Sequence, residues 1–590
     1  NEMAIQKERV NVVLVGFGWT GAIFGEQLTA AGQTVVALER GHMQQTSTDA
    51  KFPQVADELN YGVRGKLFQP LAKDSLTIRH DVGHTAVPYR QYGSFLLGNS
   101  VGGAGLHWNG MFYRYLPNQL RLKSFYEEKY GKGIVPEGMY LQDYPVSYEE
   151  LEPYFAKFEE VCGVSGQAGN LKGVKLKGGN PFEGWRSTEF PNKPLINSYA
   201  SELFRKGCEE LGYSPYPAPA ANASAPYTNQ YGVRLGPCNY CGFCEKFACY
   251  NYSKASPQTT ILPVLLQRQN FELRTNANVV KINTDSEKKI ATGVTYVDGQ
   301  GREVFQPADI VILNAFAIHN VRLLLLSKIG QPYDPVSQTG TLGRSYAYQR
   351  DVSIKVVMPA GTKLNTFIGT GAGGVAMDNF NETTFDHSGL GFLGGASIRT
   401  SIHGGRPIQQ TPTEAGSAKW GSGWKKATQE GYQRIFSIGI SGSVMSYRNA
   451  YLDLDPTYTD NLGLPLLRMT FNWHANENKV ANYLMNKMAF VGRALGGKVE
   501  YEDFALDAPY DTRKYQSTHN TGGAIMGDDP STSVVNKYLQ HWDVHNLFVS
   551  GASAFPQNVG YNPTALVGAL AYFSVSNIVE KYLPKPGMMV

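Results

Sequence analysis

The sequence lacks a long uninterrupted apolar run, which argues against a membrane-spanning helix. A transmembrane helix needs about 20 consecutive apolar residues. The richest apolar stretch, residues 310–329, is interrupted by Asn314, His319, Asn320 and Arg322. Residues 1–10 also lack the apolar core of a secretory signal peptide. We therefore expect neither a signal peptide nor a membrane span.

The chain has little excess charge of either sign. Lys and Arg number 54 and Asp and Glu number 50, which gives a formal net charge of +4 over 590 residues. This charge is too weak to favour binding to nucleic acid or directly to an anionic membrane. The sequence shows no repeat or low-complexity segment, and its length predicts roughly two to four globular domains.

Cysteine is scarce, yet four of the six cysteines lie in one short segment: Cys238, Cys241, Cys244 and Cys249. Thiols packed this closely cannot all pair as disulfides without strain, and zinc sites usually join two separated C-x-x-C segments. The spacing C-x2-C-x2-C-x4-C is close to the ferredoxin spacing C-x2-C-x2-C-x3-C-P, which favours an iron-sulfur cluster and electron transfer. A zinc loop and simple buried thiols are the alternatives. Cys162 and Cys208 are interpreted as small core residues.

The N-terminal 40 residues match a dinucleotide-binding unit. An apolar run at 10–15 precedes the glycine-rich turn Gly16-Phe-Gly18-Trp19-Thr20-Gly21, and a helical pattern then leads to a second apolar run that ends at Glu39. The glycines allow close approach of a pyrophosphate to a helix N-terminus, and Glu39 can bind ribose hydroxyls. Glu39 followed by Arg40 favours a free 2′-hydroxyl, hence FAD or NAD.

Further motifs extend along the chain in a fixed order. They are Gly98-Asn99-Ser-Val-Gly102-Gly103-Ala-Gly-Leu-His107-Trp108-Asn109-Gly110, the segment 311–327, His519-Asn-Thr-Gly522-Gly-Ala-Ile-Met526-Gly527, Asn546 to Ser553, and Asn562-Pro563. In order and spacing they resemble the glucose-methanol-choline (GMC) family of flavin oxidoreductases. Two departures stand out: Gly551 replaces an acid that the family usually carries, and Gly343-Arg344-Ser345-Tyr346 replaces a longer family motif.

The resemblance implies FAD as the cofactor and a fold with two parts. We expect a Rossmann-like α/β FAD domain built from residues 1–125, 261–334 and 506–590, an insertion at 126–260 that holds the cysteine loop (238–249), and an antiparallel-sheet substrate domain at 335–505, α+β overall. Short alternating runs near 353–358 and 434–440 support the sheet. The flavin contacts are expected from Gly16, Gly18, Trp19, Thr20, Gly21, Glu39, Arg40, Gly98, Asn99, Gly102, Gly103, His107, Trp108, Asn109, Val280, Gly551, Ala552, Asn562, Pro563 and Thr564.

The resemblance also assigns the chemistry. His519 matches the family's base, which accepts the proton of a substrate alcohol, and Asn562 would hydrogen-bond the same hydroxyl. A surface histidine and an ordinary helix cap are the respective alternatives. His107 stands where some relatives bond covalently to the flavin, and packing without a bond is the alternative. The helix after Pro563 would direct its positive N-terminus at the flavin.

More narrowly, the cysteine loop, His107-Trp108 and the C-terminal motifs resemble the flavoprotein subunits of bacterial membrane-bound gluconate, fructose and sorbitol dehydrogenases. This implies oxidation of a sugar acid, D-gluconate, to 2-dehydro-D-gluconate, with fructose, the polyol sorbitol or 2-ketogluconate as alternative substrates. The resemblance further implies a 3Fe-4S cluster, rather than a 4Fe-4S cluster, that passes electrons to a cytochrome c subunit. It also implies a small subunit with a twin-arginine signal and a place on the periplasmic face of the inner membrane, with membrane association through the partners. A GMC oxidase using dioxygen is one alternative, and a noncatalytic flavin-binding relative is another. Four cations near motifs are candidates for a substrate carboxylate: Arg90, Arg344, Arg350 and Lys514.

Overall fold

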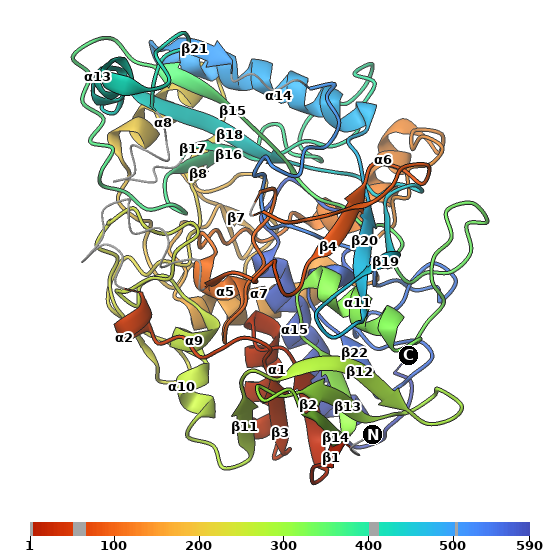
Figure 1. Cartoon of the computed structure of the whole chain (residues 1–590). Helices are drawn as coiled ribbons and strands as arrows, with labels where there is room; N and C mark the ends of the chain where they lie inside the picture. Colours follow the sequence, from red (N-terminus) through yellow and green to blue (C-terminus); the bar gives the residue numbers. More distant parts are fainter. Residues whose placement is uncertain (1–3, 51–66, 92, 401–411, 502–505, 590) are drawn as a thin grey trace.

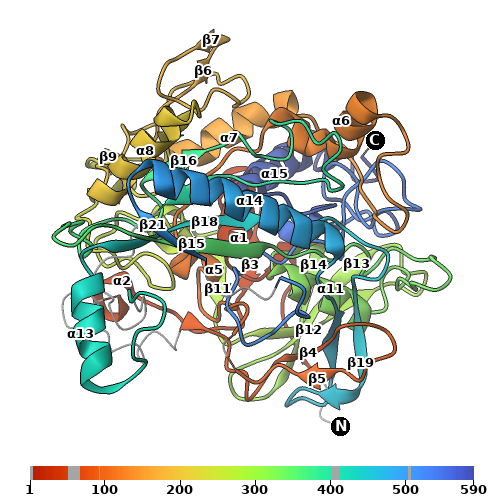
Figure 2. The same ribbon diagram turned by 90° about the horizontal axis from the view of Figure 1, so that it is seen from above.

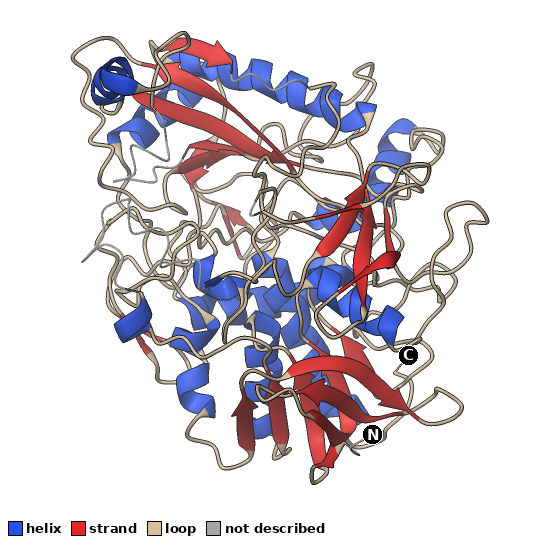
Figure 3. Cartoon of the chain, in the orientation of Figure 1, coloured by secondary structure: helices blue, strands red, loops and turns tan. Residues whose placement is uncertain are grey.

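The computed structural model describes residues 4–50, 67–91, 93–400, 412–501 and 506–589. Its strands gather mainly in two large sheets at opposite ends of the molecule, with helices and long loops between them (Figures 1 and 3). The first sheet combines strands from the beginning, middle and end of the chain. The nucleotide-binding part is therefore assembled from discontinuous segments.

The first sheet has eight strands in the order β11-β3-β2-β14-β13-β12, with β1 and β22 also paired to β14. Its parallel part consists of β1 (Ile5–Gln6), β2 (Val10–Val15), β3 (Val35–Leu38), β11 (Phe271–Arg274), β14 (Glu303–Leu313) and β22 (Leu547–Val549). The strands β12 (Asn278–Thr284) and β13 (Ala291–Val297) extend it in antiparallel fashion. β3 is wholly buried, as expected for a parallel strand covered on both faces.

Two apolar helices pack beside this sheet. α1 (Trp19–Ala30) follows the first glycine turn, and α15 (Thr564–Asn577) lies next to it in the interior of the fold. α7 (Tyr148–Cys162) covers α15 from the other side and begins at Ser147, whose hydroxyl accepts a hydrogen bond from the backbone N–H of Glu150. Because α15 is apolar around almost its whole circumference, it can only be a core helix.

The second sheet is antiparallel, in the order β21-β15-β18-β17-β16-β8. Its strands are β8 (Pro215–Pro217), β15 (Arg350–Val357), β16 (Val375–Met377), β17 (Ile398–Thr400), β18 (Ile435–Gly442) and β21 (Lys498–Tyr501). The helices α8 (Tyr199–Glu210) and α14 (Ala475–Ala494) pack against it, and α14 crosses β15 and β18 in the view from above (Figure 2). The predicted fold class, a Rossmann-like part plus an antiparallel sheet, is confirmed.

A third sheet joins distant segments, in the order β19-β20-β4-β5. Its strands are β4 (Leu76–Arg79), β5 (Val87–Pro88), β19 (Tyr451–Thr459) and β20 (Pro465–Thr470). Thus a strand from the predicted first FAD segment pairs with one from the predicted substrate domain, while β8 of the predicted insertion belongs to the antiparallel sheet. The domain boundaries themselves stay predictions.

Short elements complete the described chain. The helices are α2 (Thr46–Asp49), α5 (Ala104–His107), η3 (Pro117–Arg121), α6 (Leu122–Tyr130), α9 (Pro257–Thr260), α10 (Leu262–Leu265), α11 (Ala317–Leu326), α13 (Gly421–Gly431), η4 (Ala552–Ala554) and the π-helical turn η5 (Ile578–Tyr582). The strand pairs are β6 (Asn170–Leu171) with β7 (Val174–Lys175), and β9 (Tyr227–Thr228) with β10 (Arg234–Leu235).

Candidate active site

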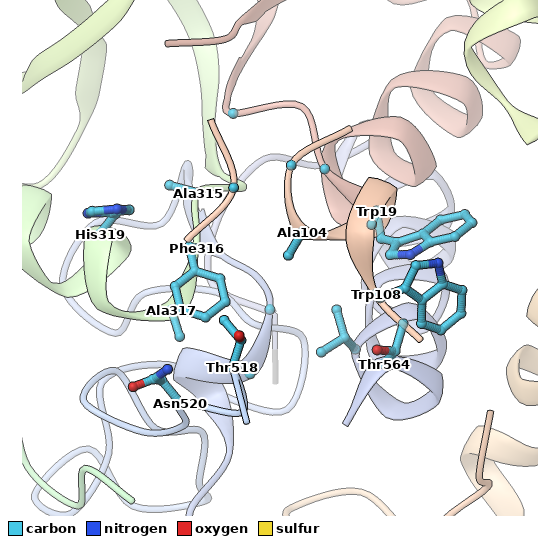
Figure 4. Close-up of a pocket in the computed structure, with 18 of the residues that line it drawn as sticks. Trp19, Ala104, Trp108, Ala315, Phe316, Ala317, His319, Thr518, Asn520 and Thr564 are labelled. Atoms are coloured by element: carbon cyan, nitrogen blue, oxygen red, sulfur yellow. The ribbon is translucent and has the colours of Figure 1, made fainter. Parts of the chain in front are cut away.

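One cavity collects most of the residues that the sequence singles out. Its wall is formed by the first glycine turn, the end of β3, the second glycine loop, the start of α11, the segment 515–520 and the N-terminus of α15. Figure 4 shows Trp19 and Trp108 side by side at one side of this cavity and His319 at the opposite side. The two indole rings meet edge to face with centroids 5.7 Å apart.

The two glycine loops are joined to each other. The backbone N–H of Gly102 donates to the carbonyl of Phe17 at 2.6 Å. Gly16 has φ +102°, and a Cβ there would lie 2.7 Å from the carbonyl oxygen of Asn314, so only glycine fits. A Cβ on Gly21 would lie 2.4 Å from the carbonyl oxygen of Gly16. The first glycine turn therefore lies close to the end of β14. The N-terminus of α1, which follows this turn, faces the cavity and can bind a phosphate.

Glu39 lies at the end of β3 with its carboxylate held by the backbone. The N–H of Phe17 donates to Oε2 at 2.9 Å, and the N–H of Gly41 donates to Oε1 at 2.7 Å. Burial raises the pKa of Glu39, and the two backbone hydrogen bonds act against that rise. Each carboxylate oxygen retains a lone pair for a ribose hydroxyl. This fixed acceptor, together with the glycine cradle, fits the adenosine diphosphate half of FAD.

Not every predicted cofactor residue lines the cavity. Gly21, Asn99 and Gly102 lie behind the wall, where they shape the turns, and Val279 rather than Val280 faces the cavity. Neighbouring side chains in a strand point to opposite faces, which accounts for the difference of one residue. Arg40 lines the cavity, but its guanidinium forms an ion pair with Asp74 and donates a hydrogen bond to Oε1 of Gln69 at 3.0 Å. The others are on the wall: Gly16, Gly18, Trp19, Thr20, Glu39, Gly98, Gly103, His107, Trp108, Asn109, Gly551, Ala552, Asn562, Pro563 and Thr564.

His107 ends α5 with its ring in the cavity wall. Its Nδ1 is buried and has no hydrogen-bond partner among the described residues. Burial, followed by the charge of Lys254, lowers the pKa of His107 to about 3, so the imidazole is neutral. The ring of Phe68 packs edge to face on it at 4.9 Å. A neutral ring with an unpartnered nitrogen suits either contact with a flavin or a bond to it.

His519 has one defined tautomer. Its Nδ1 contacts Oε1 of Gln349, while Nε2 of Gln349 donates to the carbonyls of Val559 and Tyr561, both at 2.8 Å. Those carbonyls fix the amide of Gln349, so its oxygen must accept from Nδ1–H of His519. The Nε2 atom of His519 therefore carries the lone pair. Burial, followed by the charge of Arg399, lowers the pKa of His519 to about 3.

Hydrogen bonds also fix the orientation of the Asn562 amide. Its Oδ1 accepts a hydrogen bond from Nη1 of Arg399 at 3.0 Å, and its Nδ2 lies 3.4 Å from Nε2 of His519. The structure thus brings together the two predicted catalytic side chains. Sequence reasoning missed both Gln349 and Arg399, since neither lies in a recognisable motif.

The N-terminus of α15 opens on the cavity. Pro563 precedes the helix, Thr564 and Val567 line the wall, and no side chain caps the first turn. Its positive end therefore stabilises negative charge that develops in the cavity. Gly551, with φ +90°, lines the same wall and offers backbone atoms where an acid was expected from the family pattern.

The cysteine loop lies directly behind His107 and Trp108. The backbone N–H of Lys246 donates to the carbonyl of His107 at 2.8 Å. Glu245 and Lys246 line the cavity, while the four loop cysteines do not. The loop therefore reaches the cavity next to the predicted flavin contacts.

Within the loop the sulfur atoms receive hydrogen bonds. Backbone N–H groups of Tyr240 and Lys254 lie 3.4 Å from Sγ of Cys238 and 3.5 Å from Sγ of Cys249. Burial, followed by the charge of the neighbouring Cys244, raises the pKa of Cys241 to about 12. All six cysteines of the chain are thiols. Grouped thiols with N–H donors to sulfur fit an iron-sulfur cluster. In the described part of the chain, no three His, Cys, Asp or Glu side chains converge as ligands of one metal ion, but a cluster does not require this because its cysteines bind different iron atoms.

Lys254 connects the two loops. Its buried ammonium group donates to the carbonyl of Trp108 and, at 2.7 Å each, to the carbonyls of Cys244 and Phe247. One cation therefore fixes the position of the cysteine loop relative to Trp108. The three carbonyls account for all three ammonium hydrogens.

Comparison with known proteins agrees with this architecture. Two models of GMC oxidoreductases match residues 142–343 and 447–571. The chain is 51% identical to a gluconate 2-dehydrogenase flavoprotein of Pantoea cypripedii, over 100% of this chain and 96% of that protein. It is 25% identical to the fructose dehydrogenase large subunit of Gluconobacter japonicus, over 97% of this chain and 98% of that one.

The fold also recurs in a solved structure. Pyridoxine 4-oxidase from Mesorbium loti superposes with a TM-score of 0.60 at 14% identity, over 96% of this chain and 99% of that chain. Together with the glycine turns that can bind a dinucleotide and the matched motifs, these similarities show that the chain belongs to the GMC oxidoreductase family, and membership of this family implies FAD as the cofactor.

Proposed function

We propose that this protein oxidises the C2 hydroxyl of D-gluconate to give 2-dehydro-D-gluconate, with FAD held in the cavity. The observation that carries the proposal is the pair formed by Nε2 of His519 and Nδ2 of Asn562, 3.4 Å apart on the cavity wall. The 51% identical relative that is named a gluconate 2-dehydrogenase flavoprotein supports the choice of substrate.

The residues divide the work of alcohol oxidation between them. The lone pair on Nε2 of His519 accepts the hydroxyl proton, while Nδ2 of Asn562 donates a hydrogen bond to the same oxygen as negative charge develops there. Gln349 holds the tautomer that makes this possible, and Arg399 holds the amide of Asn562. The flavin, when bound, supplies a hydride acceptor. The N-terminus of α15 stabilises the charge that the hydride brings.

In this proposal the loop of Cys238, Cys241, Cys244 and Cys249 would hold an iron-sulfur cluster, which would supply an exit path for electrons. The contact between Lys246 and His107 and the position of Lys254 support it, because they place the loop directly behind the predicted flavin residues. We retain a 3Fe-4S cluster on three of the thiolates as the proposed form. A zinc loop with dioxygen as the electron acceptor is the competing function, and measured iron content with broad visible absorption distinguishes the two.

The acceptor is proposed to be a cytochrome c subunit in a larger complex. The similar proteins named a flavoprotein and a large subunit imply a protein of several subunits. None of the helices in the described residues is both long and apolar enough to cross a bilayer. We further propose, from the resemblance to membrane-bound sugar dehydrogenases, that a small subunit with a twin-arginine signal carries this chain to the periplasmic face of the inner membrane.

The proposal is tested by anaerobic reduction of the protein-bound flavin. Gluconate should bleach the flavin absorbance, and 2-dehydro-D-gluconate should be the product. 2-Ketogluconate, fructose and sorbitol serve as competing substrates in the same assay. If one of these bleaches the flavin and gluconate does not, the substrate assignment is wrong.

A further inference from the structure

Arg399 is a cation in the cavity whose assigned role, holding the amide of Asn562, does not use its charge. It lies on β17, is partly buried, and lines the cavity beside Asn562. Its Nη1 donates to Oδ1 of Asn562 and its Nη2 to Oγ of Ser441, both at 3.0 Å. No Asp or Glu in the described part of the chain forms an ion pair with it. A guanidinium has five N–H donors, so the two hydrogen bonds to Asn562 and Ser441 leave further donors of Arg399 for a ligand.

We propose that Arg399 binds the carboxylate of a 2-hydroxy acid substrate and selects aldonates over neutral polyols. This inference rests on the proposed function, because it names the group that recognises the acid end of gluconate. A guanidinium matches a carboxylate with two parallel hydrogen bonds and gives both affinity and orientation.

The geometry follows from the structure of the substrate. In a 2-hydroxy acid the carboxylate carbon is bonded directly to the carbon that carries the reacting hydroxyl. The group that binds the carboxylate must therefore lie beside the groups that bind the hydroxyl. Arg399 is hydrogen-bonded to Asn562, which faces His519, so it occupies that place. A carboxylate anchored there brings C2, rather than C3 or C5, to His519.

The cations expected from the sequence are engaged elsewhere. The guanidinium of Arg344 lies over the ring of Tyr140 at 4.4 Å. Arg350 lines a different cavity, where it lies over the ring of Trp473 at 4.7 Å and donates to the carbonyl of Leu506 at 3.0 Å. Arg90 and Lys514 are exposed.

Lys246 is the other cation on this part of the wall, and it has partners of its own. Its Nζ lies over the ring of Tyr515 at 3.7 Å and 3.8 Å from a carboxylate oxygen of Glu245. Between these two cations, Arg399 is the one that forms no ion pair with a described carboxylate, although Asp351 lies on the same wall and interacts with its charge. Ser441 fixes the plane of its fork through the bond to Nη2.

The test compares gluconate with gluconamide, which has the same hydroxyls and no charge. Arg399→Met also loosens Asn562, which slows both substrates, so the ratio of the two kcat/KM values isolates recognition of the charge. We expect Arg399→Met to lower the gluconate-to-gluconamide ratio about 10- to 100-fold, the usual contribution of a hydrogen-bonded charge. Arg399→Lys, which keeps the charge and loses the fork, should give an intermediate ratio. Arg350→Met is the matched control and should leave the ratio unchanged.

A binding measurement separates this inference from the proposed function. 2-Deoxygluconate keeps the carboxylate and lacks the reacting hydroxyl, and its binding is followed by the change in flavin absorbance. Weaker binding to Arg399→Met than to the unmutated protein, at equal flavin content, supports the inference even if gluconate is not oxidised. Equal binding, or an unchanged ratio in Arg399→Met, overturns it, whereas gluconate failing to reduce the unmutated protein overturns only the proposed function.

Discussion

Gln349 accepts a hydrogen bond from Nδ1–H of His519 and thereby determines which nitrogen of the imidazole can act as a base. The amide is locked by the carbonyls of Val559 and Tyr561, so the arrangement does not depend on a bound ligand. A histidine without such a partner would divide its population between two tautomers. The proposed base is therefore held in the required tautomer before a substrate enters.

Removing the base should abolish most of the turnover. We expect His519→Ala to bind FAD normally and to lose roughly a hundredfold or more in kcat, the usual contribution of general-base catalysis. Steady-state kinetics with an artificial electron acceptor measures this. His84→Ala, a change at an exposed histidine outside the cavity, is the control and should keep full turnover. Near-normal kcat in His519→Ala at saturating substrate would disprove the assignment.

Asp351 should make gluconate binding depend on pH. Burial raises its pKa to about 7, and the charge of Arg399 limits the rise. Below this pH the carboxyl is neutral. As the pH rises through about 7 it becomes an anion that competes with the substrate for Arg399. We expect the KM for gluconate to increase over that interval, while the KM for gluconamide changes little.

The other titratable groups around Asp351 do not account for this change. His519 stays neutral because its pKa is lowered to about 3, and burial raises the pKa of Tyr515 far above this interval. Glu245 and Lys246 also line the cavity, and both are unchanged in the control variant Asp351→Asn. Asp351→Asn should give a KM for gluconate that is flat with pH. A rise that persists in this variant would assign the effect to another group.

The flavin bond at His107 is open to a direct measurement. A neutral imidazole whose Nδ1 has no hydrogen-bond partner among the residues that the structure describes is suited to forming the bond. If it forms, protein on a denaturing gel keeps flavin fluorescence, and His107→Ala releases FAD on denaturation. Free FAD in the supernatant of the acid-precipitated, unmutated protein would show that the flavin is held without a bond.

The cysteine loop should serve electron exit and not the oxidation of substrate. We expect Cys241→Ser and Cys244→Ser to retain anaerobic reduction of the flavin by gluconate, because the hydride chemistry occurs in the cavity. Iron content and electron transfer to cytochrome should both fall. Cys208→Ala, a change at a core cysteine outside the loop, should retain iron. Undiminished cytochrome reduction after loss of iron would exclude the relay.

Location should depend on the partner subunit. If a small subunit with a twin-arginine signal exports this chain, as proposed, the chain expressed without that subunit should stay in the cytoplasm. Coexpressed with a small subunit that carries a twin-arginine signal, it should be exported with FAD and iron already bound, which protects the thiolates from oxidation. Cell fractionation with and without the small subunit measures this. Arrival of the chain in the periplasm unaided would contradict the dependence.

The local motifs were predictable from the sequence because each is set by neighbouring residues. The turn from Gly16 to Gly21 needs glycine backbone conformations and a following helix, and both can be read from adjacent positions. The paired strands β15 and β18 follow from the alternation of apolar residues. The family motifs also named His519 and Asn562 in advance, and the structure places them together.

Contacts between distant segments were decided only by the tertiary structure. Gln349 lies 170 positions from His519, Arg399 lies 163 from Asn562, and Lys254 lies 146 from Trp108. No local pattern in the sequence shows that Arg399 lies on a strand, β17, that directs it at the cavity. The sequence alone therefore determined the glycine turns of the predicted cofactor site, because local spacing encodes them, and the family resemblance pointed to His519 as the predicted base. The partners that orient the base, and the cation proposed to select the substrate, depend on how two sheets pack around the cavity, which no local pattern records.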